Sequence, residues 1–149
     1  MKLLTALAGI LFGTNATACP QIIGTWQSSK EMSMEYNIKS ADLTPTQIEF
    51  LNQALGILKI TYNQETIINH GAPTIEMVIE DKKYPFEFQE EKFKYEIISC
   101  TASVVKIKHY YPHTAPEKIK INFIGENTYW VSPSNLPKSR EYFTRVPAT

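Results

Sequence analysis

The chain is 149 residues long, and its 15 basic and 15 acidic side chains balance to a formal charge of zero. This length is enough for one domain with a substantial core. The lysines alternate with apolar and acidic residues, as in the stretch from Lys92 to Glu96, and no basic run stands out. Since nucleic acids and anionic membranes bind clustered basic surfaces, we expect neither as a partner.

The N-terminus has the three parts of an export signal. Lys2 supplies a positive charge, residues 3–12 are mostly apolar, and residues 16–18 (Ala-Thr-Ala) give the small-residue pattern that precedes a signal-peptidase site. The apolar run is shorter than the roughly 18 residues of a membrane-spanning helix. We therefore expect residues 1–18 to be a signal peptide. Residues 19–149 should form a single exported domain, periplasmic or secreted, without a transmembrane segment.

Cys19 and Cys100 are the only cysteines in the sequence, and two interpretations of them are open. In an oxidising compartment they can form a disulfide that closes a loop of about 80 residues, worth roughly 4 kcal/mol in the chain-entropy model. Alternatively, Cys19 directly follows a small residue and can be the acylated first residue of a membrane-anchored lipoprotein, although Ala16 stands where that motif usually has leucine. We expect the disulfide, because an even cysteine count in an exported domain usually reflects pairing.

The first half of the chain contains one predicted helix. Residues 22–27 form a strand-like segment, and the following residues up to 42 are polar without a sustained period, which predicts a loop. Thr44 is a good N-cap and Pro45 suits the first helical position. Apolar residues then recur at helical spacing, so we expect a helix over residues 45–57 that buries one face against the sheet.

From Lys59 onward the hydrophobic period changes to that of strands. Short alternating segments are separated by turn residues throughout the rest of the chain. About eight to nine short strands joined by brief turns are typical of an antiparallel meander that closes into a barrel. We therefore expect a mainly β fold, a β-barrel with one helix in the N-terminal half.

Residues at the two ends of the chain suggest how the barrel closes. Gly24 and Trp26 lie in the first strand and Arg145 in the last. If these strands pair, the guanidinium lies over the indole in a cation–π contact of roughly 0.5–2 kcal/mol, with Arg140 as the second choice. A Gly-x-Trp and a late arginine of this kind resemble those of the lipocalin-like (calycin) barrels. The resemblance implies a closed barrel with these residues at its closure, but it does not fix a ligand.

Alternation places a set of aromatic residues on one face of adjacent strands, where a closed sheet turns them toward its axis. An eight-stranded barrel is just wide enough to be filled by side chains or to hold one small ligand. These residues therefore either fill the interior or line an apolar pocket at the barrel mouth. The candidate ligand-binding residues are Tyr84, Phe86, Phe88, Phe93, Tyr95 and Phe123.

No sequence motif predicts catalysis or a metal site. His109 and His113 are four residues apart, but in a strand and loop this spacing does not bring them together, and His70 is distant in sequence. The chain has no Gly-x-Ser-x-Gly, P-loop or dinucleotide-binding pattern. Trp130 is interpreted as a core residue. We expect no cofactor, no metal and no enzymatic activity.

Three functions compete at this point. The resemblance implies a non-enzymatic protein that binds a small apolar or amphipathic molecule at the barrel mouth. The second hypothesis is an envelope protein-binding module of the inhibitor or immunity type, which would present Tyr110, Tyr111 and His113 on an exposed loop. The third is an enzyme built on the same barrel, which would need a histidine or glutamate of perturbed pKa in a cleft.

Overall fold

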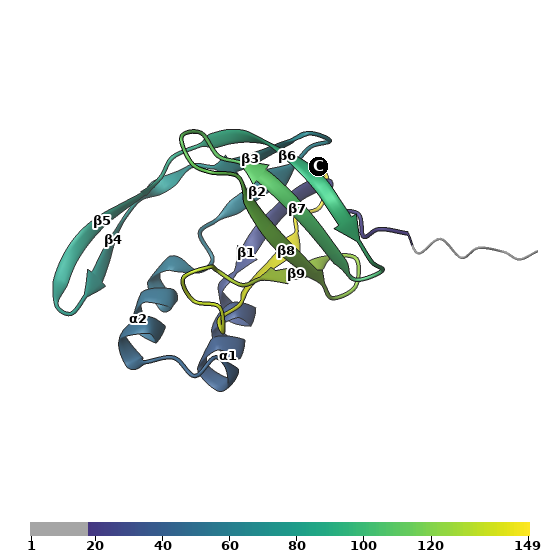
Figure 1. Ribbon diagram of the computed structural model, residues 1–149. Coiled ribbons are helices and arrows are strands. Elements are labelled where there is room, and N and C mark those ends of the chain that lie inside the picture. Colours follow the sequence, from purple (N-terminus) through teal and green to yellow (C-terminus); the bar gives the residue numbers. More distant parts are fainter. Residues whose placement is uncertain (1–17) are drawn as a thin grey trace, which may run out of the picture.

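The computed structural model describes residues 18–149. Eight antiparallel strands form a closed barrel in the order β1-β10-β9-β8-β7-β6-β3-β2 (Figure 1). Each strand pairs with the next barrel strand along the chain, and the first pairs with the last, so the predicted meander is confirmed. The predicted signal peptide covers residues 1–18, of which residues 1–17 lie outside the described part. The barrel strands are β1 (Gly24–Ser29), β2 (Lys59–Tyr62), β3 (Thr66–His70), β6 (Glu91–Cys100), β7 (Val104–Tyr110), β8 (Glu117–Phe123), β9 (Thr128–Val131) and β10 (Glu141–Arg145).

Two helices lie between β1 and β2, where the sequence predicts one. The second, α2 (Pro45–Ala54), matches the predicted helix, and Thr44 and Gln47 form a capping box at its start. The first, α1 (Lys30–Ser40), replaces the loop expected over residues 27–42. It has no apolar stripe, and its buried residues are Ser33 and Asn37.

Polar side chains dock α1 against the backbone of β10 and the residue before it. Ser33 Oγ accepts a hydrogen bond from the Tyr142 backbone N–H at 2.9 Å. The Asn37 side chain exchanges two hydrogen bonds with the backbone of Arg140, at 2.8 and 2.9 Å. Because hydrogen bonds rather than apolar contacts mark the buried face, hydrophobic periodicity does not reveal this helix.

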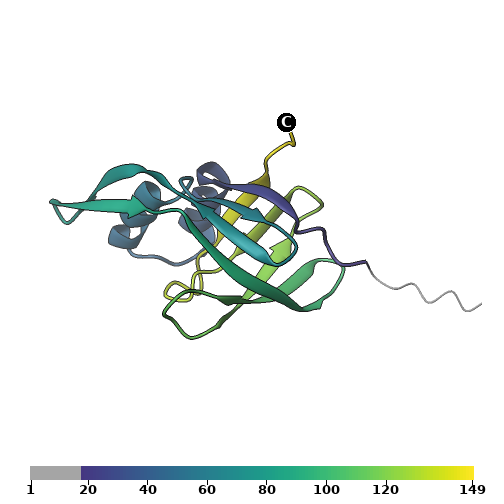
Figure 2. The ribbon, with the colours of Figure 1, turned by 90° about the horizontal axis from the view of Figure 1, so that it is seen from above.

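A two-stranded hairpin leaves the barrel between β3 and β6. It consists of β4 (Ala72–Ile79) and β5 (Lys82–Phe88), which pair only with each other. Glu80 and Asp81 turn the chain with φ angles of 50° and 62°, the left-handed values that a tight type I′ turn requires. Figures 1 and 2 show the hairpin projecting from the barrel beside α2.

Part of the aromatic set that was predicted to line the barrel lies on this hairpin instead. Tyr84, Phe86 and Phe88 lie on β5, so the prediction that they face the barrel axis is wrong. The hairpin packs on α2 instead, where Val78 exchanges two backbone hydrogen bonds of 2.6 Å with the Gln53 side chain. Period-2 alternation indicates a strand with one covered face, but not which part of the fold covers it.

Aromatic side chains fill one part of the barrel interior. Trp26, Tyr129 and Phe143 are all at most 1% exposed. Tyr129 stacks on Phe143 with ring centroids 5.0 Å apart and meets Trp26 edge-on at 4.7 Å. Both are favoured aromatic geometries. This cluster lies where the first and last strands meet.

The first and last strands close the barrel as predicted. Trp26 and Arg145 stand opposite one another in the β1–β10 register, and the guanidinium carbon lies 4.2 Å from the centroid of the indole. The guanidinium also donates to the carbonyls of Ile23 at 2.8 Å and Gln21 at 2.5 Å. Gly24 has a φ of +130°, and a Cβ there would lie 2.7 Å from Arg145 Nη1. Glycine therefore leaves the room that the arginine occupies.

A second arginine stack holds α1 against the barrel. The Arg140 guanidinium lies between Tyr36 of α1 and Trp130 of β9, at 4.1 and 3.8 Å from their ring centroids. Trp130 is thus half-buried on the outer face, and its interpretation as part of the interior core is wrong. Arg145, not Arg140, closes the barrel.

A disulfide joins Cys19 to Cys100, as expected, with their Cα atoms 5.5 Å apart. The bond uses the sulfur that acylation of Cys19 would need. It fastens the segment before β1 to the end of β6, and it suggests an oxidising, exported environment. Within residues 18–149, no helix is long and apolar enough to cross a membrane.

Candidate functional site

A small cavity lies inside the barrel among the described residues. Its volume is about 150 Å³, and strands all around the barrel contribute to its mostly apolar wall. An apolar cavity of about 150 Å³ in another protein holds benzene. The lining residues are Leu58, Ile60, Tyr62, Ile67, Asn69, Phe93, His109, Tyr111, Ile119, Tyr129, Val131, Glu141 and Phe143.

The Tyr129 side chain lines this cavity, and its hydroxyl is buried beside the Tyr62 phenol. Among the described residues it is the buried side-chain polar atom that lacks a hydrogen-bond partner. Burial raises the pKa of Tyr129, and the neighbouring Tyr62 phenol raises it further. Burial likewise raises the pKa of Tyr62 well above its usual value. An unsatisfied buried hydroxyl costs about 1–3 kcal/mol, and the Tyr62 phenol beside Tyr129 is not aligned to hydrogen-bond with it fully. A reorientation of the Tyr129 side chain would let its hydroxyl hydrogen-bond to a molecule in the cavity.

Glu141 brings a carboxyl group into the wall of the same cavity. Burial raises the pKa of this carboxyl, and a hydrogen bond from Ser28 Oγ, 2.6 Å from Oε1, partly offsets that effect. No lysine or arginine lines the cavity. The interior therefore offers hydrogen-bonding groups but no permanent cation that would compensate a buried anion, and its one histidine, His109, lies beside Glu117.

A hydrogen-bonded pair stands between the cavity and a groove outside it. Asn69 Nδ2 donates to the Tyr111 hydroxyl at 2.7 Å, and the Tyr111 ring stacks on Phe93 with centroids 4.1 Å apart. The outer groove has a volume of about 430 Å³ and is lined in part by the end of β5. Leu58, Asn69 and Tyr111 line both spaces, so the groove is the mouth of the cavity.

Three of the predicted ligand-binding residues meet at this site, from two different layers of the fold. Phe93 of β6 lines the cavity. Phe86 and Phe88 of the hairpin line the groove at the mouth, with their rings packed edge-on at 4.8 Å. The hairpin thus brings aromatic side chains to the barrel mouth from outside the barrel wall.

The other three predicted residues lie elsewhere. Tyr95 is buried in the core, and its hydroxyl donates to the Asn63 carbonyl at 2.6 Å. Phe123 packs edge-on against Trp26, in the aromatic cluster near the barrel closure. Tyr84 is 47% exposed on the hairpin and lines neither the cavity nor the groove.

The residues predicted to form a partner-binding loop do not share one exposed surface. Tyr110 is exposed on the outer face of β7, where its hydroxyl donates to Glu96 at 2.6 Å. Tyr111 instead packs inward against Phe93. His113 is exposed in the loop after β7, with a φ of 65°.

The three histidines occupy separate environments. His109 is buried in the cavity wall, where its Nε2 lies 3.4 Å from Glu117 Oε2. His113 lies in the loop and His70 on the outer face of the barrel. No group of three His, Cys, Asp or Glu side chains placed to hold a metal ion occurs in residues 18–149.

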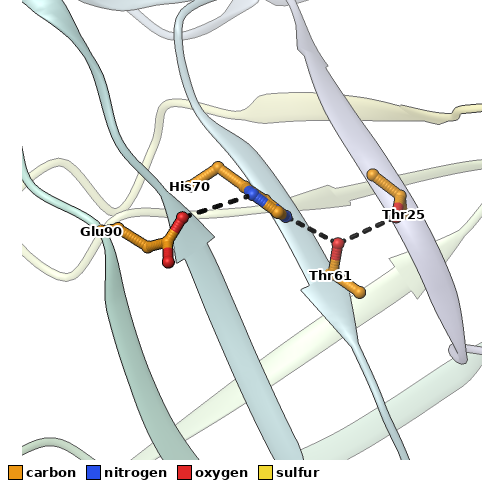
Figure 3. A network of polar contacts seen from close by, with 4 residues as sticks. All are labelled: Thr25, Thr61, His70 and Glu90. Carbon is orange, nitrogen blue, oxygen red and sulfur yellow. Dashed lines mark hydrogen bonds and ion pairs between the residues drawn. The ribbon is translucent and has the colours of Figure 1, made fainter.

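His70 belongs to a line of polar contacts that crosses three strands (Figure 3). Its Nε2 lies 2.7 Å from Thr61 Oγ1, which in turn lies 2.8 Å from Thr25 Oγ1. Its Nδ1 is 4.0 Å from Glu90 Oε2. The order of hydroxyl, imidazole and carboxylate is that of a hydrolytic triad, but the last distance exceeds a hydrogen bond. We interpret these contacts as cross-strand pairs that stabilise the sheet.

The outer face of β6, β7 and β8 gathers six lysines, which we call the lysine face. They alternate along each strand with residues that point inward, so a pattern that is dispersed in the sequence becomes a cluster in the sheet. The expectation that the chain has no clustered basic surface is therefore wrong. The lysine face consists of Lys92, Lys94, Lys106, Lys108, Lys118 and Lys120.

Sequence reasoning missed the polar residues of the cavity. Glu141 shares the inward face of β10 with Phe143, and Asn69 shares that of β3 with Ile67. Tyr129 holds the inward position of β9. The sequence contains a signal for these residues: each stands at an alternate strand position that is otherwise apolar. Such a position places a polar group in the barrel interior.

Comparison of the chain with protein-family models, curated proteins and solved structures found no match. The assignment of a function therefore depends on the geometry of the cavity and its mouth.

Proposed function

We propose that this protein is an exported, non-enzymatic, lipocalin-like carrier that binds a small neutral amphipathic molecule in the barrel cavity and its mouth. The unpaired Tyr129 hydroxyl carries this proposal. A folded protein that leaves a buried hydroxyl without a partner loses about 1–3 kcal/mol. A bound hydroxyl, carbonyl or amide group would recover that loss and gain selectivity.

The wall of the cavity defines the polar end of the ligand. Glu141 and Tyr129 can hydrogen-bond to an uncharged group, whereas no lysine or arginine lines the cavity and His109 faces Glu117. A carboxylate buried there would lose its hydration without gaining an ion pair. The ligand should therefore carry an alcohol, ketone or amide rather than an acid.

The mouth groove defines the rest of the ligand. Phe86 and Phe88 provide an apolar wall next to Leu58, and Tyr111 connects this wall to the cavity. A short alkyl or aryl chain can run from the cavity past the Asn69–Tyr111 pair into the groove. Ligand sites commonly combine such an apolar lining with a few placed polar groups.

The experiment is a calorimetric titration with 1-octanol and octanoate, which have the same chain length and different head groups. At neutral pH we expect saturable binding of 1-octanol and at least about tenfold weaker binding of octanoate. Tyr129→Phe should weaken 1-octanol binding by about fivefold, the loss of one hydrogen bond. The matched control is Tyr95→Phe, which removes a phenolic hydroxyl that does not line the cavity and should leave the affinity unchanged.

Two outcomes would contradict the proposal. One is the absence of saturable binding of either compound by the folded protein, which would leave a protein-binding role as the better hypothesis. The other is tighter binding of octanoate than of 1-octanol, because no lysine or arginine lines the cavity to pair with a carboxylate.

A further inference from the structure

The lysine face has a charge arrangement that the fold itself does not require. Lys106 stands directly opposite Lys120, and Lys108 directly opposite Lys118, in the β7–β8 register. Directly opposed residues of an antiparallel pair have Cα atoms only about 4.5–5.5 Å apart. Like charges at such positions repel and destabilise the sheet.

Little on this surface compensates the repulsion. The lysines that form ion pairs within residues 18–149 are Lys39, Lys83 and Lys138, and none of them belongs to the lysine face. Glu96 stands opposite Lys108 in the β6–β7 register and accepts a hydrogen bond from the Tyr110 hydroxyl, and the Lys108 ammonium lies 5.3 Å from the centroid of the Tyr110 ring. These contacts compensate part of the charge of Lys108 only. Six ammonium groups thus share the outer surface with the carboxylates of Glu96 and Glu90, and the excess of positive charge is complementary to an extended anionic partner.

The shape and chemistry of the surface indicate which anionic partner fits. It is the outer wall of a barrel, and none of its six lysines lines the cavity or the mouth groove. None lines a further hollow that is bordered by Cys19, Phe123 and Arg145. Proteins that bind single-stranded nucleic acid use a basic groove with aromatic platforms. The two arginines that stack on aromatic rings, Arg140 and Arg145, contact Tyr36, Trp130 and Trp26 and do not belong to the lysine face. The cations of this surface are lysines, which bind phosphate as point charges.

Apolar residues border the lysines at a β-bulge. Ile97 and Ile98 are 49% and 46% exposed, and the register of β6 and β7 shifts between Ile97 and Ser99. Ile97 pairs with Ile107 and Ser99 with Lys106, so the bulge adjoins the lysine face at Lys106. Lysines beside exposed apolar side chains are the composition of surfaces that rest on a lipid headgroup layer.

We propose that the lysine face docks this protein on a bilayer of anionic phospholipid. The disulfide suggests an exported environment, in which membrane surfaces rather than nucleic acids are the extended anionic partner. The lysines contact headgroup phosphates, and Ile97 and Ile98 enter the headgroup layer. This inference does not depend on the ligand proposed for the cavity.

The test is co-sedimentation of the disulfide-bonded protein with lipid vesicles. Mass spectrometry of the same sample establishes at which residue the protein begins. Vesicles of phosphatidylcholine with about 30% phosphatidylglycerol should bind it at low salt, and pure phosphatidylcholine should not. Raising the salt to about 0.3 M should release it, because the Debye length then falls to a few ångströms. The key variant replaces the four central lysines by glutamine: Lys106→Gln, Lys108→Gln, Lys118→Gln and Lys120→Gln.

We expect this variant to bind the anionic vesicles at least about a hundredfold more weakly, since each lysine near such a surface contributes roughly fivefold. Its melting temperature should be equal to or above that of the parent, because the opposed like charges are gone. A control with the same net charge change should keep most of the binding. It carries Lys30→Gln, Lys39→Gln, Lys59→Gln and Lys82→Gln, all outside the lysine face.

Three results would overturn the proposal. The first is failure of the parent protein to bind anionic vesicles at low salt. The second is an equal loss of binding in the control variant, which would show an effect of net charge alone. The third is tighter binding to single-stranded DNA than to the vesicles, which would make the lysine face a nucleic-acid surface.

Discussion

Replacing Arg145 by alanine tests the contact that closes the barrel. The substitution removes the stack on Trp26, which is worth about 1 kcal/mol at a half-buried site. It also removes the hydrogen bonds to the Ile23 and Gln21 carbonyls, together about 1–1.5 kcal/mol after exchange with water. Loss of the packing of the side-chain stem adds about 0.5 kcal/mol. We therefore expect unfolding to become easier by about 3 kcal/mol.

Urea denaturation followed by tryptophan fluorescence measures this change. With a slope of about 1.5 kcal/mol per molar urea, the midpoint should fall by about 2 M. Lys138→Ala is the matched control, because the Lys138–Asp42 ion pair is exposed at 71% and 89% and should contribute close to nothing. A loss below about 0.5 kcal/mol for Arg145→Ala, or a loss equal to the control, would refute the closure argument.

Two further substitutions test the interior and the disulfide. Burial raises the pKa of Glu141 above the value near 4.5 that this carboxyl has in the unfolded chain. The folded protein therefore keeps the carboxyl protonated to higher pH than the unfolded chain does. As pH rises from about 4.5 through the folded pKa, the unfolding free energy of the protein should fall and then level off. Glu141→Gln should remove this fall. In urea titrations the variant should be more stable than the parent at about pH 8 and similar to it at about pH 4. A pH profile of stability that is unchanged by the substitution would contradict the burial of the carboxyl. Replacing both Cys19 and Cys100 by serine opens a loop spanning 81 residues. The chain-entropy model predicts a loss of about 4.5 kcal/mol of unfolding free energy, measured from urea midpoints at equal protein concentration. A loss near zero would contradict a stabilising disulfide.

The sequence was sufficient for the parts of the fold that rest on hydrophobic periodicity and on special residues. Strand alternation predicted the meander, and Thr44 with Pro45 predicted the start of α2. Trp26 and Arg145 predicted the closure, because a guanidinium and an indole form a favourable stack and both residue types are visible in the first and last strands.

The remaining features depend on long-range geometry. Helix α1 is held by Ser33 and Asn37, whose hydrogen bonds to β10 and Arg140 span more than 100 residues of chain. The hairpin was mistaken for barrel wall, because Phe86 alternates in the same way whether α2 or the barrel interior covers one face. The lysine face arises from the pairing of strands, as in the register of Lys106 and Lys120, and no single stretch of sequence contains it.

The central claim is that the Tyr129 hydroxyl is kept for a ligand rather than for the fold. Unfolding free energies of the parent and of Tyr129→Phe, each with and without 1-octanol, test it most directly. Without 1-octanol the variant should be more stable than the parent by about 1 kcal/mol, because it no longer buries an unpaired hydroxyl. With 1-octanol the parent should gain more stability than the variant, because a ligand stabilises in proportion to its affinity for the folded state. A variant that is less stable than the parent without 1-octanol and gains as much from it as the parent would contradict the account, since the hydroxyl would then serve the fold alone.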